Sequence, residues 1–254
     1  MKVVASIEAR MGSSRLPGKT MKNILDKPML ELMIERIKRC TMIDEIVIAT
    51  SNSKNDDIIE ILAQKLSISC FRGSEEDVLK RVLDAVKSVE GDIIVELWGD
   101  TPLIDPFVID TMVKFFQENK FDCVGTVLPN FKKSFPLGIS SLIFPTEILE
   151  NIEKITQNPD DRENVSNYIY EHPKIYKLAP LPCPHELNYP DLRLVVDEIT
   201  DFEFIKNIFE YLYPKNPNFS TLDIINFLNE NPHLLEINKH VKQKRLKNWD
   251  EDRK

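Results

Sequence analysis

Residues 3–19, V-V-A-S-I-E-A-R-M-G-S-S-R-L-P-G-K, decide the fold class. Residues 3–9 are apolar and β-branched enough to predict a buried strand, and at Arg10 the chain enters a loop. Similar runs follow at 45–50, 69–72 and 93–97, and the segments between them carry apolar residues at helical spacing. Because short strands that alternate with helices form crossover units, this order predicts an α/β, Rossmann-like fold. Its mixed, mostly parallel sheet is expected to have helices on both faces.

The pattern changes after residue 128. Residues 129–145 are interrupted by three prolines and one glycine, which predicts a loop with an added strand or hairpin. The remaining expected elements are a helix at 108–117, a strand at 122–127, an extended proline-rich loop at 180–190, a strand-like run at 192–196, and helices at about 200–213 and 221–230.

The composition is that of an ordinary cored protein. The 254 residues carry a formal net charge of −8, which argues against general nucleic-acid binding because coating a polyanion requires a positive surface. The sequence has no apolar run of about 18 residues, so no membrane partner is expected. An apolar signal core is also absent at the start and the four cysteines are widely spaced, which favours reduced thiols in a cytoplasmic protein.

The loop at 10–19 concentrates positive charge on this acidic chain. Glycines permit close backbone approach, serine hydroxyls donate hydrogen bonds, and fixed cations neutralise phosphate charge. The combination predicts a cradle for a triphosphate, with a solvated basic turn as the alternative. The residues concerned are Arg10, Gly12, Ser13, Ser14, Arg15, Gly18 and Lys19.

A P-loop is a competing interpretation of the same segment. The pattern G-x-x-x-x-G-K-[ST] resembles residues 12–20, but five residues separate Gly12 from Gly18, and Pro17 removes a backbone N–H from the phosphate nest. Residues 93–100 can still be interpreted as the strand and magnesium aspartate of such a protein. A kinase or NTPase that acts on the γ-phosphate therefore stays open at this point.

Two other expected strands end in acidic residues. Asp100 follows the run at 93–97, and Asp197 follows the run at 192–196. Ligands of open α/β sheets bind beyond the carboxyl ends of the strands, so both aspartates are expected to face the basic loop. Mg²⁺ takes one or two carboxylates together with phosphate oxygens and water, which this arrangement supplies. The structural alternatives are a turn residue for Asp100 and a helix N-cap for Asp197.

Six motifs are informative as a set: I-E-A-R-M-G-S-S-R-L-P-G-K (7–19), D-K-P-M-L (26–30), D-E-I-V-I-A-T (44–50), F-R-G-S-E-E-D-V-L (71–79), W-G-D-T-P-L-I-D-P (98–106) and V-V-D-E-I-T-D-F (195–202). They resemble the cytidylyltransferase family, which includes spore-coat polysaccharide, 3-deoxy-manno-octulosonate and acylneuraminate cytidylyltransferases. The resemblance covers residues 2–213 and is closest to the spore-coat polysaccharide branch. It implies a fold of the nucleotide-diphospho-sugar transferase type.

The resemblance also implies a reaction. Family members transfer CMP from CTP to an oxygen of a sugar, often a sugar acid, and release pyrophosphate, here for a surface polysaccharide or glycan. By that analogy Arg10, Arg15 and Lys19 hold the phosphates and take up charge on the leaving pyrophosphate. Asp100 and Asp197 are the implied Mg²⁺ ligands. The other implied nucleotide-binding residues are Gly12, Ser13, Ser14 and Arg72, although 72–77 is equally typical of an ordinary helix start.

The implied organisation is one nucleotidyltransferase domain at 1–236 and a C-terminal tail at 237–254. Within the domain we expect a nucleotide-binding half at 1–128 and an acceptor-binding half at 129–236. The expected partners are a nucleoside triphosphate and a small sugar acceptor, and a homodimer is expected by analogy alone.

The acceptor half departs from the family pattern. The spore-coat branch usually carries acids after its P-x-G, as in G-L-D-V-E-V-F, whereas residues 138–144 are G-I-S-S-L-I-F, so Ser140 and Leu142 replace them. Asn164 likewise stands where R-E-H-V-T has histidine. Two interpretations stay open: an acceptor different from that of the branch, or a nucleotide-binding protein that has lost transfer activity.

Overall fold

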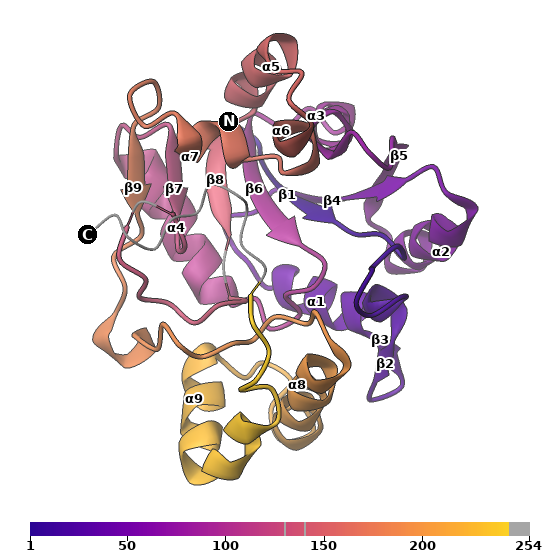
Figure 1. Cartoon of the computed structure of the whole chain (residues 1–254), viewed down its shortest axis with the longest axis vertical. Coiled ribbons are helices and arrows are strands. Elements are labelled where there is room, and N and C mark those ends of the chain that lie inside the picture. The colour runs from indigo at the N-terminus through magenta and orange to yellow at the C-terminus, as the bar shows by residue number, and fades with distance from the viewer. Residues whose placement is uncertain (130, 140, 244–254) are drawn as a thin grey trace.

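A seven-stranded sheet forms the centre of the computed structural model, which describes residues 1–129, 131–139 and 141–243 (Figure 1). The strand order is β5-β4-β1-β6-β8-β7-β9, and a small hairpin of β2 and β3 lies apart from it. The strand bounds are β1 Val3–Glu8, β2 Asn23–Ile24, β3 Lys27–Pro28, β4 Glu45–Ser51, β5 Ser69–Gly73, β6 Ile93–Trp98, β7 Cys123–Gly125, β8 Leu142–Pro145 and β9 Leu178–Pro180.

The strands β1, β4, β5 and β6 pair in parallel, whereas β8 runs antiparallel to both of its neighbours, β6 and β7. The expected mixed, mostly parallel sheet is therefore confirmed. From β1 the chain passes outward through β4 to β5 and then returns to place β6 on the other side of β1. The order thus reverses between β1 and β6, and in such sheets ligands bind beyond the carboxyl ends of those strands.

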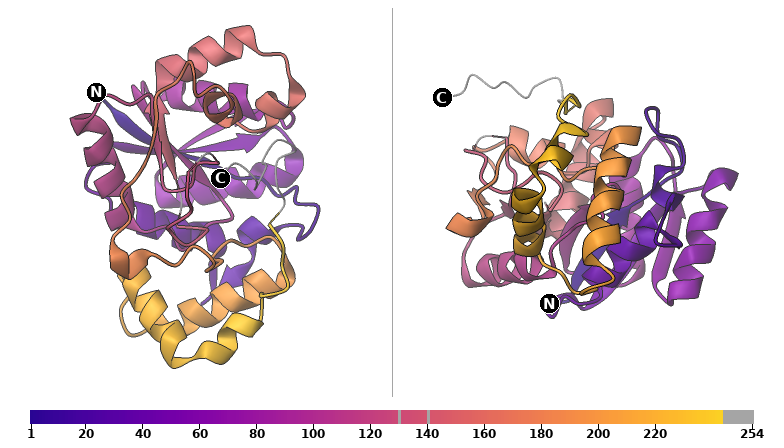
Figure 2. Two further views of the ribbon diagram at one scale, coloured as in Figure 1. Left: turned by 60° about the vertical axis from the view of Figure 1, so that its left-hand side comes forward. Right: turned by 90° about the horizontal axis from the view of Figure 1, so that it is seen from below.

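Helices cover both faces of the sheet (Figures 1 and 2). Side chains alternate along each strand, so Ala5 and Ile7 pack with α1, α2 and α4 on one face, while Val4 packs with α3, α5 and α7 on the other. The α-helix bounds are α1 Met29–Ile37, α2 Asp57–Leu66, α3 Val78–Ser88, α4 Pro106–Glu118, α5 Thr146–Ile155, α6 Pro159–Glu163, α7 Asn167–Glu171, α8 Ile199–Leu212 and α9 Thr221–Glu230. The 3₁₀ helices are η1 Lys19–Met21, η2 Lys54–Asp56, η3 His185–Leu187 and η4 Pro232–Glu236.

The run at 192–196 is extended, as expected, but it is not a strand of the sheet. Leu137 forms an isolated bridge with Arg193, and the N–H of Val196 donates to the carbonyl of Asp100 at 2.9 Å. Leu194 and Val196 are fully buried, so this apolar run is stabilised by the core more than by strand pairing. Its path along the loop after β6 brings Asp197 to the carboxyl edge of the sheet.

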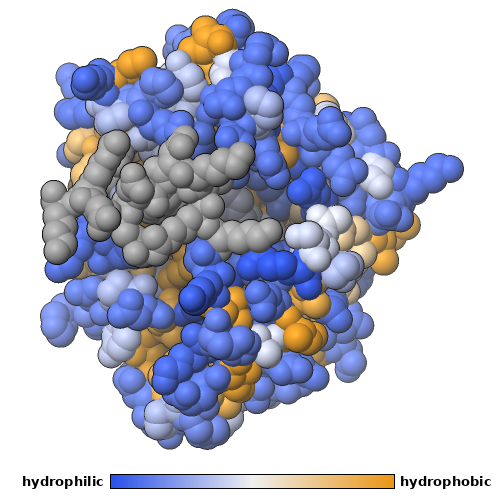
Figure 3. Space-filling model, in the orientation of Figure 1, coloured by the Kyte–Doolittle hydropathy of each residue, from blue (hydrophilic) through white to orange (hydrophobic). Residues whose placement is uncertain are grey.

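The C-terminal helices α8 and α9 lie together at one end of the molecule (Figure 1). A buried arginine connects them to the sheet layer: Arg36 of α1 donates to the carbonyls of Ile104 and Phe219, and its guanidinium lies 4.4 Å from the centroid of the Phe219 ring. The face seen in Figure 3 is mainly hydrophilic. Among the described helices, none is long and apolar enough to cross a membrane. The predicted tail lies outside the described residues from 244 onward.

Candidate active site

The loop that follows β1 is fixed by its own backbone. The carbonyl of Met11 accepts hydrogen bonds from the N–H groups of Ser13 and Gly18, each at 3.0 Å. Gly18 has a φ of 70°, a left-handed conformation that glycine adopts without steric cost. The Met11 N–H donates to the Asp56 carboxylate at 2.7 Å, and the hydroxyl of Thr20 donates to the carbonyl of Arg10 at 3.1 Å. These bonds fix the loop against its surroundings.

The same loop is not a P-loop. A P-loop ends at the N-terminus of an α-helix whose N–H groups bind phosphate, whereas here the chain enters the three-residue 3₁₀ helix η1 and then the β2–β3 hairpin. Lys19 lies within η1 and extends away from its own backbone toward the loops after β6 and before α8. The P-loop interpretation is therefore wrong.

Lys19 joins two aspartates that are far apart in the sequence. Its Nζ lies 2.9 Å from Asp100 Oδ2 and 3.3 Å from Asp197 Oδ1, and it donates to the carbonyl of Val196 at 2.6 Å. The Lys19 side chain is 12% exposed, so these contacts are made in a largely desolvated place. The three strand-end loops singled out in the sequence thus meet at one point.

Asp197 is surrounded by cations. Its Oδ1 lies 2.7 Å from an Nη of Arg15, and its Oδ2 accepts a hydrogen bond from Arg193, also at 2.7 Å. Burial acts to raise the pKa of Asp197, but Lys19, Arg193 and Arg15 outweigh it and hold that pKa below its ordinary value. Asp197 is therefore a carboxylate at neutral pH. The N-cap position of α8 belongs to Glu198, so the N-cap alternative for Asp197 does not apply.

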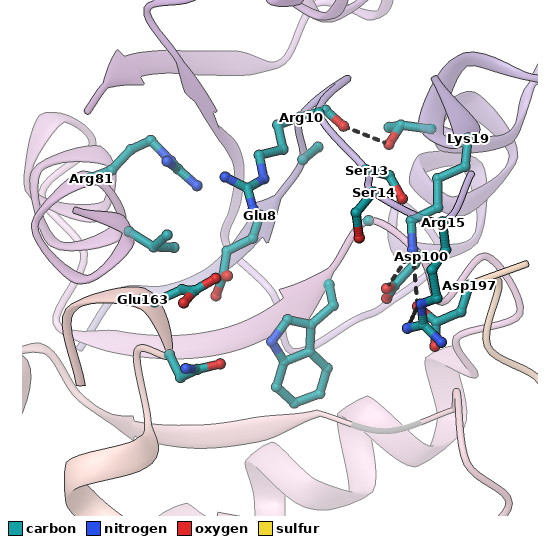
Figure 4. Close-up of a pocket in the computed structure, with 17 residues that line it drawn as sticks. Glu8, Arg10, Ser13, Ser14, Arg15, Lys19, Arg81, Asp100, Glu163 and Asp197 are labelled. Atoms are coloured by element: carbon teal, nitrogen blue, oxygen red, sulfur yellow. Dashed lines mark hydrogen bonds and ion pairs between the residues drawn. The ribbon is translucent and has the colours of Figure 1, made fainter. Parts of the chain in front are cut away.

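A cavity of about 290 Å³ opens beside this cluster (Figure 4). In Figure 4, Arg15, Lys19, Asp100 and Asp197 lie on one side of it and Glu8, Arg81 and Glu163 on the other. Predicted residues that line the cavity are Arg10, Gly12, Ser13, Ser14, Arg15, Lys19, Asp100 and Asp197. We refer to this space as the phosphate cavity, after the ligand that we propose for it.

Arg72 does not line the phosphate cavity. Its Nη1 lies 2.6 Å from Asp57 and 3.0 Å from Glu60, and its other nitrogens donate to the carbonyls of Ser51 and Ser53. The cause is topological: Arg72 lies on β5, the edge strand, two strands away from β1. The structure thus uses Arg72 to hold the connection between β4 and α2.

Residues that the sequence interpretation overlooked also line the phosphate cavity: Glu8, Val78, Arg81, Trp98 and Glu163 are among them. A signal was available for Glu8, which interrupts an otherwise apolar strand, because an ionisable group at such a position requires a partner. Arg81 had a weaker signal, since it lies four residues after Asp77 in an ordinary amphipathic helix. The position of Glu163 depends on α6, which no sequence pattern predicted.

A second cavity, of about 470 Å³, adjoins the first and is more apolar. The two share five lining residues: Glu8, Trp98, Asp100, Glu163 and Asn164. We refer to it as the acceptor cavity, after the ligand that we propose for it. Two of the positions that depart from the family pattern, Leu142 and Asn164, lie on its wall, while Ser140 lies outside the described residues.

Asp100 and Asp197 are the carboxylates available to a metal beside the loop. Within the described chain no group of three or more His, Cys, Asp and Glu residues could hold an ion by itself. The pair fits a hard divalent cation that takes its remaining ligands from phosphate and water. The Lys19 ammonium now lies between the two carboxylates, so it must turn toward the phosphates when a cation takes that place.

A basic loop that faces two aspartates across the switch point of a mostly parallel sheet defines an enzyme class that handles nucleoside polyphosphates. The comparison with known families specifies it further. Residues 4–246 match the family model described as cytidylyltransferase, so the chain belongs to the cytidylyltransferase family. The resemblance identified in the sequence and the predicted reaction class are thereby confirmed.

Individual relatives agree with this assignment. The spore coat polysaccharide biosynthesis protein SpsF of Bacillus subtilis is 33% identical over 231 residues, which are 89% of this chain and 93% of that protein. A cytidylyltransferase structure from Leptospira borgpetersenii is 34% identical with a TM-score of 0.86, covering 96% of this chain and 100% of the other. A CMP:2-keto-3-deoxy-manno-octonic acid synthetase complexed with CTP has a TM-score of 0.61 at 19% identity, over 83% of this chain and 99% of that one, which shows the shared fold.

Proposed function

We propose that this protein transfers CMP from CTP to an oxygen of a sugar acceptor, releases pyrophosphate and uses Mg²⁺ to do so. The observation that carries the proposal is the contact of Lys19 with both Asp100 and Asp197 in the phosphate cavity, next to the acceptor cavity that Asp100 also lines. The names of the relatives support a product used for polysaccharide biosynthesis. Homodimerisation and a cytoplasmic location stay predictions.

The triphosphate is assigned to the phosphate cavity. Arg10, Arg15 and Lys19 supply positive charge, and Gly12, Ser13 and Ser14 leave room for the phosphates to approach the backbone. The bond that breaks joins the α-phosphorus to the oxygen bridging to the β-phosphate, so negative charge grows on the leaving pyrophosphate. Fixed cations beside that oxygen stabilise the transition state without forming a covalent intermediate.

Mg²⁺ is assigned to Asp100 and Asp197. When bound, it would neutralise phosphate charge and align the triphosphate. Asp197 is held ionised by its three cationic neighbours, and Asp100 is 27% exposed and so open to a ligand from the cavity. Both side chains therefore present carboxyl oxygens to the phosphate cavity, where the reacting phosphate is assigned.

The acceptor is assigned to the acceptor cavity, whose wall meets the phosphate cavity at Asp100. The attacking oxygen forms a bond to the α-phosphorus as the pyrophosphate leaves. This assignment gives the two halves of the domain their proposed roles, because the segment after residue 128 supplies Leu142, Glu163 and Asn164 to the acceptor side. The division at 1–128 and 129–236 is part of the proposal.

Asp100→Asn tests the proposal. The variant retains the size of the side chain but loses the charge at the junction, so we expect pyrophosphate release from CTP to fall at least about a thousandfold. Asp191→Asn, which neutralises an exposed aspartate, is the matched control and is expected to retain full turnover. Pyrophosphate release should be followed with all four nucleoside triphosphates across a sugar panel, with circular dichroism to verify folding. Near-normal turnover by folded Asp100→Asn would exclude the metal assignment.

A transfer-inactive nucleotide-binding protein is the second candidate. It is favoured by Leu142 and Asn164, which lie on the acceptor cavity wall at positions where the spore-coat branch differs. The two candidates differ in one measurement. Calorimetric binding of CTP without pyrophosphate release from any sugar in the panel would support the inactive form, whereas turnover with one acceptor excludes it.

A further inference from the structure

Two glutamates lie next to each other beneath the acceptor cavity. In the parallel pairing of β1 and β6, Glu8 is opposite Trp98 and Glu96 is opposite Ser6, so the two glutamates project from the same face with an offset of two residues. Glu96 is only 1% exposed, and both glutamates line the cavity. Acids at such positions are costly unless a partner compensates them.

Several buried polar atoms on this face of the sheet have no hydrogen-bond partner. They are Ser6 Oγ, Glu8 Oε1, Arg81 Nε and Glu96 Oε2. Folded proteins leave few buried polar groups of this kind without a partner, because each one destabilises the fold. Two of these four atoms, Glu8 Oε1 and Glu96 Oε2, belong to residues that line the acceptor cavity, so a polar group bound there can complete their hydrogen bonding.

The two carboxyl groups share a side-chain hydrogen bond, and the attraction of Arg81 for Glu8 does not offset the effect of their burial. Burial and the proximity of Glu96 raise the pKa of Glu8 well above its ordinary value, and burial raises the pKa of Glu96 to about 7. Near neutral pH the pair therefore holds a proton. A cationic ligand at Glu8 would replace that proton and let both glutamates be charged.

The surroundings favour a positive ligand over a negative one. Among the described residues that line the acceptor cavity, four are acidic (Glu8, Glu96, Asp100 and Glu163) and none is Lys, Arg or His. Arg15 and Lys19 are paired with aspartates, and Nη1 of Arg81 donates to the carbonyls of Ser74 and Glu75 on the phosphate side. A sugar carboxylate placed there would meet like charges without an opposing arginine.

We propose that the acceptor carries a primary ammonium group, as an amino sugar does, and that Glu8 and Glu96 recognise it. The inference rests on the proposed function, because it assigns the substrate of the same site. Glu8 contacts the ammonium, and Glu96 lies behind Glu8 and adds negative charge. An ammonium supplies three N–H donors, which suits the two unpartnered carboxyl oxygens of Glu8 and Glu96 once the proton that they share has been displaced.

The test compares acceptors that differ in one substituent. Aminohexoses with the amino group at carbon 2, 3, 4 or 6 are each assayed beside their N-acetyl and hydroxyl counterparts, with 3-deoxy-manno-octulosonate as the carboxylate probe. We expect at least one aminohexose to exceed its counterparts by about tenfold or more in kcat/KM for pyrophosphate release. Glu8→Gln and Glu96→Gln should reduce that ratio to about twofold or less.

Glu118→Gln is the matched control. It removes one carboxylate from the exposed end of α4, on the opposite face of the sheet, and should leave the tenfold ratio unchanged. Preference for the sugar acid over every aminohexose would overturn the proposal. So would an unchanged acceptor ratio in both folded glutamate variants.

Failure of the proposed function is distinguishable from failure of this inference. If no sugar releases pyrophosphate, the transfer assignment fails, and the ammonium preference is then measured by calorimetric titration of the same sugars into protein saturated with α,β-methylene-CTP. Tighter binding of an aminohexose than of its N-acetyl form, lost in Glu8→Gln, supports the inference without turnover. Equal binding of the two forms overturns it.

Discussion

Lys19 occupies the position that a divalent cation would share between Asp100 and Asp197. Its ammonium makes a charge-assisted hydrogen bond to each carboxylate, and both bonds lie where solvent has little access. The same side chain can satisfy the aspartates before the nucleotide arrives and the phosphates afterwards. Lys19 thereby prevents two neighbouring carboxylates from repelling each other in the free protein.

Lys19→Met separates these two roles. Without the ammonium, the space between the carboxylates is open to a cation, so we expect the nucleotide-free variant to bind Mn²⁺ at least about tenfold more tightly, while kcat/KM for CTP falls at least about a hundredfold. Titration calorimetry and pyrophosphate release measure the two effects.

Lys22→Met is the control for Lys19→Met, because the Lys22 ammonium lies over the Phe202 ring and contacts neither aspartate. It should bind Mn²⁺ as the native protein does. Unchanged Mn²⁺ affinity in Lys19→Met would show that the two carboxylates do not form the metal site.

Glu96 links stability to pH. Its pKa in the folded protein, about 7, is above the ordinary 4.5, because burial disfavours the charged form. As pH rises, Glu96 therefore loses its proton at a lower pH in the unfolded chain than in the folded protein. Stability from the neutral carboxyl is present in full below pH 4.5 and is lost as pH rises through 7.

Glu96→Gln should remove this dependence. We expect the native protein to lose on the order of 3 kcal/mol relative to the variant between pH 4.5 and 8.5. Urea unfolding of both proteins across this range measures the difference, which includes the change that the loss of the Glu96 charge causes at Glu8. Parallel curves for the two proteins would contradict the raised pKa.

At the scale of elements, the segment before α8 is held by its contact with the loop after β7. The N–H of Leu194 donates to the carbonyl of Leu137 at 2.7 Å, and the N–H of Leu137 donates to the carbonyl of Leu192 at 2.9 Å. Gly138, with a φ of 102°, lets the backbones approach this closely, since a Cβ there would lie 2.4 Å from the carbonyl oxygen of Leu194. This packing places Asp197 beside Lys19.

Gly138→Ala should therefore displace the whole segment before α8 that packs against this glycine. We expect a loss of about 3 kcal/mol in the free energy of unfolding, together with weaker CTP binding, because the clash is with backbone that cannot rotate away. Urea unfolding and calorimetry provide the measurements. Gly12→Ala is the stability control, since its Cβ would meet only the flexible end of Glu75. Equal stability of the two variants would argue against this role of Gly138.

At the scale of the whole molecule, nucleotide binding should stabilise the entire fold, because the site joins segments separated by most of the chain. Lys19 and Asp197 are 178 residues apart, and their contact closes the sheet onto the segment before α8. A ligand at 100 times its Kd adds about 2.7 kcal/mol. For a protein of this size that corresponds to an increase in Tm of about 5–10 °C.

CTP with Mg²⁺ is therefore expected to raise the Tm by this amount, and chelation of the metal with EDTA should remove most of the increase. Arg15→Met should show little increase, whereas Arg72→Met should retain it, since Arg72 is held by α2 acids away from the phosphate cavity. Differential scanning fluorimetry measures each shift. If CTP with Mg²⁺ no longer raised the Tm of Arg72→Met, Arg72 would have to be counted among the nucleotide-binding residues.

Much of the fold was predictable, because the largely apolar runs of β1, β4 and β6 report burial: strands covered on both faces carry mostly apolar residues. The helices α5, α6 and α7 were not predicted, since two of them are five residues long and leave little periodicity to detect. The phosphate loop was predictable because its chemistry is local. Glu8, Arg81 and Glu163 were not, since each joins the cavity from a different element.

The sequence by itself determined the mostly parallel sheet, the family and the basic loop, because apolar periodicity and contiguous motifs depend only on residues that are close together in the chain. Only the tertiary structure decided which charges meet: it placed Lys19 between Asp100 and Asp197, directed Arg72 to α2, and set Glu8 beside Glu96 below an acidic cavity. The physical reason is that electrostatic energy depends on distance and burial, and both are fixed only when β1 and β6 pair and the distant segment before α8 packs against them.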